Sequence, residues 1–214
     1  LGEVLRAAAE TGTRVVVLDR PNPLGGAHID GPLIEERWRS FIGWGPLPIV
    51  HGLTIGEIAL YYNEVLEIGC PLTVVPLRGW HRSPIWSATG LAWTPPSPHL
   101  PRELAVHAYV ATALVASVTT NVCDGVGTPM PFEVLGAEFV DGAELARDLA
   151  ARELPGVRFQ ETAFRPFYGL FAGRTLHGVR LLIDDPAAFE PVRTALALLV
   201  SLRNLYPDDL ALAD

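Results

Sequence analysis

The stretch VVVLDRPNPLGG, residues 15–26, decides the fold because it joins a short apolar strand to a rigid turn. Before it, residues 1–11 place their apolar side chains at helical spacing, and Gly12 ends that helix. A helix, a tight turn and a fully apolar strand in this order are typical of a parallel α/β sheet. We therefore predict a helix over residues 1–11, a strand over residues 14–18 and an α/β fold.

The rest of the chain continues the same pattern of helices and strands. Thr54 and Glu57 form a capping-box sequence that predicts a helix over residues 55–68. The apolar stretch PLTVVPL then predicts a strand, and Pro101 predicts a helix that runs to about residue 116. Beyond Asp141 we predict, in order, a helix over 143–154, strands over 157–164 and 175–183, and a helix over 186–205.

Composition excludes several classes of protein. The net charge of −8 and the absence of a basic stripe argue against a nucleic-acid partner. No apolar run reaches the roughly 20 residues that a membrane-spanning helix needs. The two cysteines form no CxxC motif, the six histidines form no HExxH motif, and no GxGxxG follows the strand at residues 14–18. We therefore expect no metal and no cofactor. The alternative of a nucleotide-binding protein is supported by the fold pattern alone.

Three long irregular stretches, residues 20–53, 78–101 and 119–133, contain most of the unusual polar residues. In open α/β sheets, ligands bind at the carboxyl ends of the strands. Asp19 lies there, as a ligand contact or as a loop cap. Asn22 lies between two prolines that fix its backbone, so its amide either reads a sugar hydroxyl or N-acetyl group or only shapes a turn. His51 precedes a helix N-terminus, which favours the neutral, proton-accepting imidazole, although a structural role is also open.

The second irregular stretch is rich in tryptophan. Trp80, Trp86 and Trp93 lie near Arg82 and Ser97 in the sequence, and carbohydrate sites combine aromatic faces with polar groups in this way. We expect one of the three indoles to contact a ligand while the others pack. Glycoside hydrolysis also needs an acid and a second assisting group. The candidate acids are Asp19, Asp30, Glu57, Asp124 and Glu133, of which Glu57 is expected to be occupied by its helix cap.

An ordered set of short motifs resembles the exo-acting β-N-acetylmuramidase family of bacterial cell-wall turnover (NamZ-like). The resemblance extends over nearly the whole chain. It implies a Rossmann-like domain, of which residues 1–125 are the C-terminal part with the cleft loops, followed by a smaller α/β subdomain, residues 126–214. The motifs that carry it are LDRPNPLGG, DGP, PLPIVHGLTIGEIA, LTVVPLRGW, WTPPSPHLP, TTN, GTPMPFEVLGAEF and LRNLYP.

The resemblance also implies an activity and a set of site residues. Such enzymes remove terminal N-acetylmuramic acid from peptidoglycan fragments, so the expected partner is a peptidoglycan-derived saccharide and the favoured location is extracytoplasmic. We expect Glu133 and His51 to be catalytic. The expected substrate-binding residues are Asp19, Arg20, Asn22, Trp80, Arg82, Ser97, His99 and Asn121.

Three positions depart from the family pattern. His99 stands where the family usually has Asn, Val118 where it has Glu, and Val126 where it has Arg. A Glu-His pair in the family's first half has no counterpart in this sequence, which begins without Met, so we expect the chain to derive from a longer protein whose N-terminal segment is a further partner. The alternative is a degenerate or truncated paralogue that binds muropeptides or other carbohydrates without cutting them.

Overall fold

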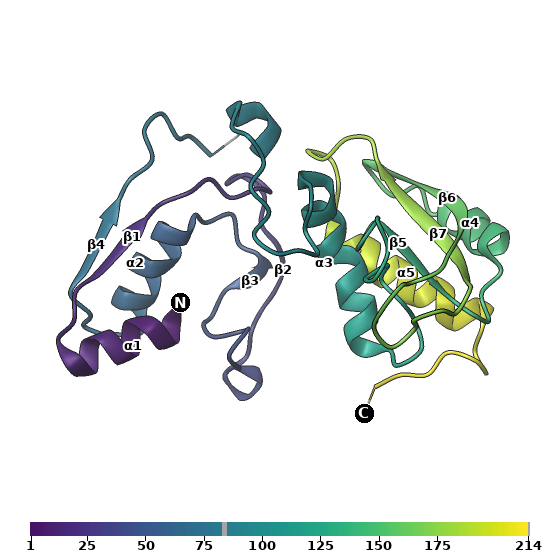
Figure 1. The fold of residues 1–214 in the computed structure, drawn as a ribbon, viewed down its shortest axis with the longest axis horizontal. Coiled ribbons are helices and arrows are strands. Elements are labelled where there is room, and N and C mark those ends of the chain that lie inside the picture. Colours follow the sequence, from purple (N-terminus) through teal and green to yellow (C-terminus); the bar gives the residue numbers. More distant parts are fainter. Residues whose placement is uncertain (83–84, 214) are drawn as a thin grey trace. The chain divides into compact units, whose positions relative to one another are not determined.

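The computed structural model describes residues 1–82 and 85–213 (Figure 1). They form two compact units, Leu1–Leu91 (unit 1) and Ala92–Asp214 (unit 2). Each unit combines helices with its own strands, and unit 1 contains a parallel pair, so the predicted α/β fold is confirmed. Among the residues described, no helix has the length and apolar character needed to cross a membrane.

Unit 1 is built on a two-stranded parallel sheet of β1 (Val15–Leu18) and β4 (Leu72–Val75). Two helices, α1 (Gly2–Thr11) and α2 (Ile55–Val65), lie on one side of this sheet (Figure 1). Side chains alternate along a strand, so Val15 and Val17 turn toward the core around Leu5 and Tyr62. The other face of the sheet is left uncovered by unit 1.

The start of α2 is fixed by a close approach between helix and sheet. Thr54 accepts a hydrogen bond from the Glu57 amide while the Glu57 side chain accepts one from the Thr54 amide, which confirms the predicted capping box. A Cβ on Gly56 would lie 2.6 Å from Val74 Cγ1 and 2.8 Å from Asp19 Cγ. Glycine therefore lets the first turn of α2 lie directly against the carboxyl ends of β1 and β4.

The first irregular stretch contains two strands that the sequence pattern does not predict. β2 (Asp30–Leu33) and β3 (Pro48–Val50) pair in antiparallel fashion with an irregular register, and η1 (Glu36–Trp38) lies between them. Both strands are short and each contains a proline, so they carry no alternating pattern. A second short helical turn, η2 (Trp86–Thr89), lies within the second irregular stretch.

Unit 2 contains an antiparallel sheet with β7 (Leu176–Ile183) between β5 (Val134–Ala137) and β6 (Val157–Phe164). Helix α4 (Gly142–Ala150) packs against β6 and β7, and α3 (Glu103–Val118) packs against α5 (Pro191–Leu205) and β7. These elements enclose a large apolar core that includes Val115, Leu135, Leu181 and Leu198.

The structure divides the chain earlier than the boundary expected between residues 125 and 126. Helix α3 and the following segment belong to unit 2, because α3 packs on α5 and contributes Ala108, Ala111 and Val115 to the unit 2 core. The sequence pattern places α3 correctly along the chain, but it does not reveal which sheet the helix covers.

Candidate functional site

Asp19 is the first polar residue after β1, and both of its carboxylate oxygens are engaged. Oδ2 accepts a hydrogen bond from Thr54 Oγ1 at 2.8 Å, and Oδ1 accepts one from the Gly56 amide, also at 2.8 Å. The carboxylate therefore lies at the positive N-terminal end of α2, where negative charge is stabilising. Of its two predicted roles, this geometry matches a loop and helix cap.

Asn22 joins the proline-rich turn to the segment that leads into α2. Its Nδ2 donates to the Leu53 carbonyl at 3.0 Å, and its Oδ1 accepts from the Leu24 amide at 2.9 Å. Each end of the amide thus has a backbone partner. The rigid presentation expected for Asn22 is present, but its hydrogen bonds hold the turn in place.

His51 lies half-buried in the same segment. Its Nδ1 accepts a hydrogen bond from the Leu53 amide at 3.0 Å. Burial lowers the pKa of the imidazole below its usual 6.5, so the neutral ring predominates at pH 7. Because Nδ1 is an acceptor, the neutral ring carries its proton on Nε2, which can donate a hydrogen bond but cannot accept one. The neutral form matches expectation, whereas the atom able to accept a proton is already occupied.

Arg82 closes the network around the start of α2. Its guanidinium donates to the Gly52 carbonyl at 3.1 Å and to Glu57 Oε1 at 2.6 Å. Glu57 also accepts from the Thr54 amide, so the helix cap and the ion pair share one carboxylate. Trp80, two residues earlier, buries its indole Nε1, which has no hydrogen-bond partner among the residues described.

Arg20 differs from these neighbours because its guanidinium is not tied into the network. Its side chain is exposed and its Cζ lies 5.6 Å from the centre of the Trp86 ring. Within residues 1–82 and 85–213 the guanidinium has no carboxylate or carbonyl partner. Stacking on the buried Trp86 ring restrains the arginine while its N–H donors stay open to a ligand.

In unit 2, Ser97 and His99 belong to one turn. Ser97 Oγ accepts from the His99 amide at 3.3 Å. The His99 ring stacks on Tyr168, with centroids 6.0 Å apart, and its Nε2 lies 2.9 Å from the Tyr168 hydroxyl. Tyr168 had no predicted role, because it is separated from His99 by 69 residues of sequence.

Asn121 and Glu133 both make contacts that stabilise unit 2. Asn121 donates to the Asp209 carbonyl at 2.8 Å and accepts from the Ala211 amide at 3.1 Å, which attaches the C-terminal segment. Glu133 is only 1% exposed, and its Oε1 accepts from Arg102 Nε at 2.5 Å. The other oxygen, Oε2, is buried without a hydrogen-bond partner among the described residues.

A pocket of about 370 Å³ lies in unit 2 at the C-terminal end of α3. Asp124 is one of its lining residues, and burial raises the pKa of that carboxyl, partly offset by backbone N–H groups and by His99. Burial also raises the pKa of the neighbouring Cys123 thiol to about 11, so the thiol stays protonated at neutral pH. The other lining residues are Ala116, Thr119, Thr120, Val122, Val126 and Tyr168–Phe171.

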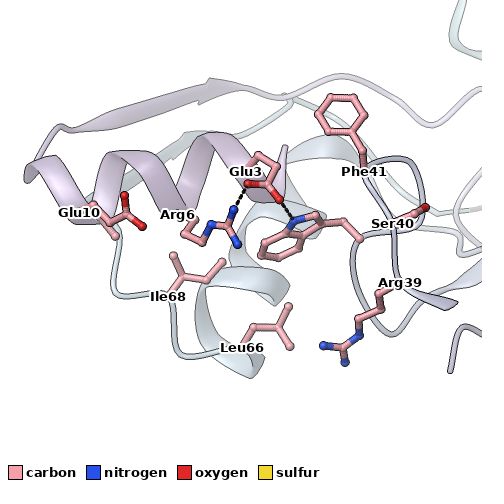
Figure 2. Close-up of a pocket in the computed structure, with 10 residues that line it drawn as sticks. Glu3, Arg6, Glu10, Arg39, Ser40, Phe41, Leu66 and Ile68 are labelled. Carbon is pink, nitrogen blue, oxygen red and sulfur yellow. Dashed lines mark hydrogen bonds and ion pairs between the residues drawn. The ribbon is translucent and has the colours of Figure 1, made fainter. Parts of the chain in front are cut away.

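A larger hollow of about 670 Å³ lies in unit 1 between α1, the loop at residues 39–44 and the end of α2. Figure 2 shows Glu3 and Arg6 side by side on α1, where they form an ion pair. Glu3 also accepts a hydrogen bond from Trp44 Nε1 at 2.8 Å. None of the predicted site residues lines this hollow. Elsewhere in the described chain, His, Cys, Asp and Glu side chains form no cluster of three that could hold a metal ion.

Comparison with known proteins places both halves of the chain in one family. The model described as exo-β-N-acetylmuramidase NamZ, N-terminal, matches residues 1–103, and the corresponding C-terminal model matches residues 107–213. The peptidoglycan β-N-acetylmuramidase NamZ of Bacillus subtilis (strain 168) is 41% identical over 205 residues, which cover 96% of this chain and 49% of that protein.

Two crystal structures of DUF1343 family proteins from Bacteroides fragilis NCTC 9343 share the fold. One has a TM-score of 0.90 at 34% identity, and the other has a TM-score of 0.70 at 26% identity. Each covers 97% of this chain and 54% of the solved chain, so the chain spans about half the length of the relatives it matches. The ordered motifs, the two family models and the shared fold agree that this chain belongs to the NamZ exo-β-N-acetylmuramidase family.

Proposed function

We propose that this chain takes part in releasing terminal N-acetylmuramic acid from peptidoglycan fragments. The observation that carries the proposal is the 41% identity to a peptidoglycan β-N-acetylmuramidase along 96% of the chain. Because the chain spans about half of that relative, the reaction is proposed for the protein to which these two units belong, and the units supply binding loops and part of the chemistry.

The proposed substrate-binding group in unit 1 is the set of loops at the carboxyl ends of β1 and β4. Asp19, Asn22 and Arg82 hold these loops through hydrogen bonds to the segment around α2. Arg20 keeps its guanidinium donors open, and a guanidinium pairs well with a carboxylate such as the lactyl group of muramic acid. We therefore assign Arg20 the direct contact in this unit and give the other three residues a positioning role.

His51 is proposed to act on the substrate through its Nε2 proton. Its neutral ring, with Nδ1 occupied by the Leu53 amide, can donate from Nε2 to an oxygen on which negative charge develops. In this role His51 donates a hydrogen bond to the reacting group. The sequence instead suggested that His51 accepts a proton. An acid is still required to protonate the leaving oxygen.

Glu133 stays the predicted acid, although its surroundings favour a structural role. Its ion pair with Arg102 and its 1% exposure leave a ligand little access to the carboxylate. That observation supports the second candidate function, a saccharide-binding paralogue without turnover. The two candidates differ in one measurable property, which is hydrolysis of a substrate that both would bind.

The test is turnover of a chromogenic β-glycoside of N-acetylmuramic acid by the purified protein to which these two units belong. We expect His51→Ala to lower the rate by about 10²-fold, the lower end of the range for a lost proton-transfer or donor group, and His81→Ala, which changes an exposed histidine in unit 1, to leave it unchanged. Glu133→Gln should abolish turnover without unfolding if Glu133 is the acid. Measurable binding of the saccharide without turnover by that unaltered protein would favour the paralogue.

A further inference from the structure

The unit 2 pocket described above contains apolar side chains and one carboxyl group that the proposed mechanism does not use. Its apolar lining comes from the end of α3 (Ala116), from Val122 and Val126, and from Leu170 and Phe171 in the loop between β6 and β7. Leu170 is 76% exposed, so this apolar surface is open to solvent. A volume of about 370 Å³ is within the range of small-molecule sites.

Asp124 provides the carboxyl group of the pocket. Its Oδ1 accepts a hydrogen bond from the Val126 amide at 3.2 Å, which fixes the side chain. Among the described residues it forms no ion pair with an arginine, and the imidazole of His99, bonded to Tyr168, is the basic group that affects it. The pocket therefore offers a hydrogen-bond acceptor without a permanent positive charge beside it.

This combination selects among the groups that a cell-wall saccharide carries. A carboxylate or phosphate would face Asp124 with no arginine to balance it, which is unfavourable. A hydroxyl group alone would lose its water against apolar side chains. An acetamido group fits both features, because its methyl gains from apolar burial while its amide N–H needs an acceptor.

We propose that this pocket binds the acetamido group of an N-acetylated amino sugar. The methyl group packs against Val122, Val126 and Phe171, and the amide N–H donates to Asp124. Tyr168, held by His99, lies at the same pocket and offers an aromatic face to the sugar ring. The inference rests on the proposed function for its choice of a saccharide, and it adds the group that is recognised and the residues that recognise it.

The experiment measures binding of two free sugars, N-acetylglucosamine and glucose, to the full chain by saturation-transfer-difference NMR. We expect the acetyl methyl of N-acetylglucosamine to receive the strongest saturation and glucose to show little. Ala116→Leu narrows the pocket and should weaken N-acetylglucosamine binding about tenfold. This is the combined effect of losing the burial of the acetyl methyl group and the hydrogen bond from the acetamido N–H. Ser117→Leu, an exposed neighbour on α3 that does not line the pocket, should bind like the unaltered chain.

A second pair of variants avoids any change to packed residues. Leu170→Ala removes an exposed lining side chain and should weaken binding, whereas Leu196→Ala changes an exposed leucine on α5 and should not. Equal binding of glucose, or no effect of both Ala116→Leu and Leu170→Ala, would overturn the proposal. Acetyl-dependent binding by a protein without turnover would contradict the proposed hydrolysis and support the proposed pocket. Turnover that does not change in these variants would support hydrolysis and contradict the pocket.

Discussion

The two units of this chain bury their sheets to very different extents. In unit 1, β1 and β4 form a parallel pair whose outward side chains are open, with Val16 54% and Leu18 70% exposed. In unit 2, β7 is paired on both edges and Leu176, Val179 and Leu181 are at most 1% exposed. Parallel sheets are normally covered on both faces, and a two-stranded sheet has little stability alone.

The cores follow the same contrast. The buried cluster of unit 1 contains Leu5, Ala8, Ala59, Tyr62 and Cys70, whereas the unit 2 cluster draws on α3, α4, α5 and the whole sheet. Unit 2 therefore has the larger buried apolar core, and in unit 1 specific polar contacts around the start of α2 add to a smaller one. The expectation that the chain derives from a longer protein with a further N-terminal segment stays a prediction.

The largest expected effect on the free energy of unfolding comes from truncating one fully buried leucine in each unit. Leu198→Ala in α5 and Leu5→Ala in α1 both truncate a leucine with 0% exposure. We expect both to cost within about 2–5 kcal/mol of unfolding free energy, with Leu198→Ala near the upper end because its large core cannot collapse around the cavity. Native-state hydrogen exchange, read separately for each unit, measures both costs. A larger loss from Leu5→Ala would mean that unit 1 is the better packed.

The next effect concerns the cap at the start of α2. Thr54 is 1% exposed, and its hydroxyl both donates to Asp19 and accepts from the Glu57 amide. Thr54→Ala should cost about 0.5–2 kcal/mol and increase amide exchange in unit 1. Thr73→Ala, at an exposed position in β4, is the matched control. Equal exchange in the two variants would show that the network does not hold the loops.

The third prediction concerns pH and compares one buried histidine from unit 2 with an exposed one from unit 1. Burial lowers the pKa of His107 below its usual 6.5, more than the neighbouring Glu103 raises it. A lowered histidine pKa means that the unfolded chain binds the proton more readily than the folded chain. The contribution of His107 to folding stability is therefore present above pH 6.5 and is lost as pH falls through the lowered pKa.

Thermal unfolding at neutral pH and at a pH below 6.5 tests this histidine. His107→Leu should reduce the loss of stability on acidification, while His81→Leu, at an exposed position, should leave it unchanged. Since partial burial also lowers the pKa of His51, the His107 variant should retain part of the acid sensitivity. An unchanged pH profile in His107→Leu would show that the buried imidazole is not the group responsible.

The smallest effect is expected on the open face of unit 1. Leu18→Thr replaces a side chain that is 70% exposed and should change the unfolding free energy by less than about 0.5 kcal/mol. This change in unfolding free energy is measured by chemical denaturation, together with hydrogen exchange in unit 1. A cost above about 1 kcal/mol would mean that this face is covered in solution, and sedimentation at several concentrations would then test self-association.

Local sequence rules succeed where a single segment contains its own signal. The helix at residues 1–11, the capping box at Thr54 and the strand at residues 157–164 each appear at the predicted place, since spacing, caps and glycine act within a few residues. The strands β2, β3 and β5 were not predicted, because they are short and are stabilised by partners far along the chain.

The candidate site shows the same division. The sequence by itself determined the α/β class, the family and the loops that hold the polar residues, because apolar periodicity and ordered motifs survive without knowledge of distant contacts. Only the tertiary structure decided that Asp19 caps α2, that Glu133 is paired with Arg102 and that Asp124 lines a pocket. Hydrogen bonds and burial depend on residues brought together by folding, and the 31 positions that separate Arg102 from Glu133 carry no local pattern that would predict their contact.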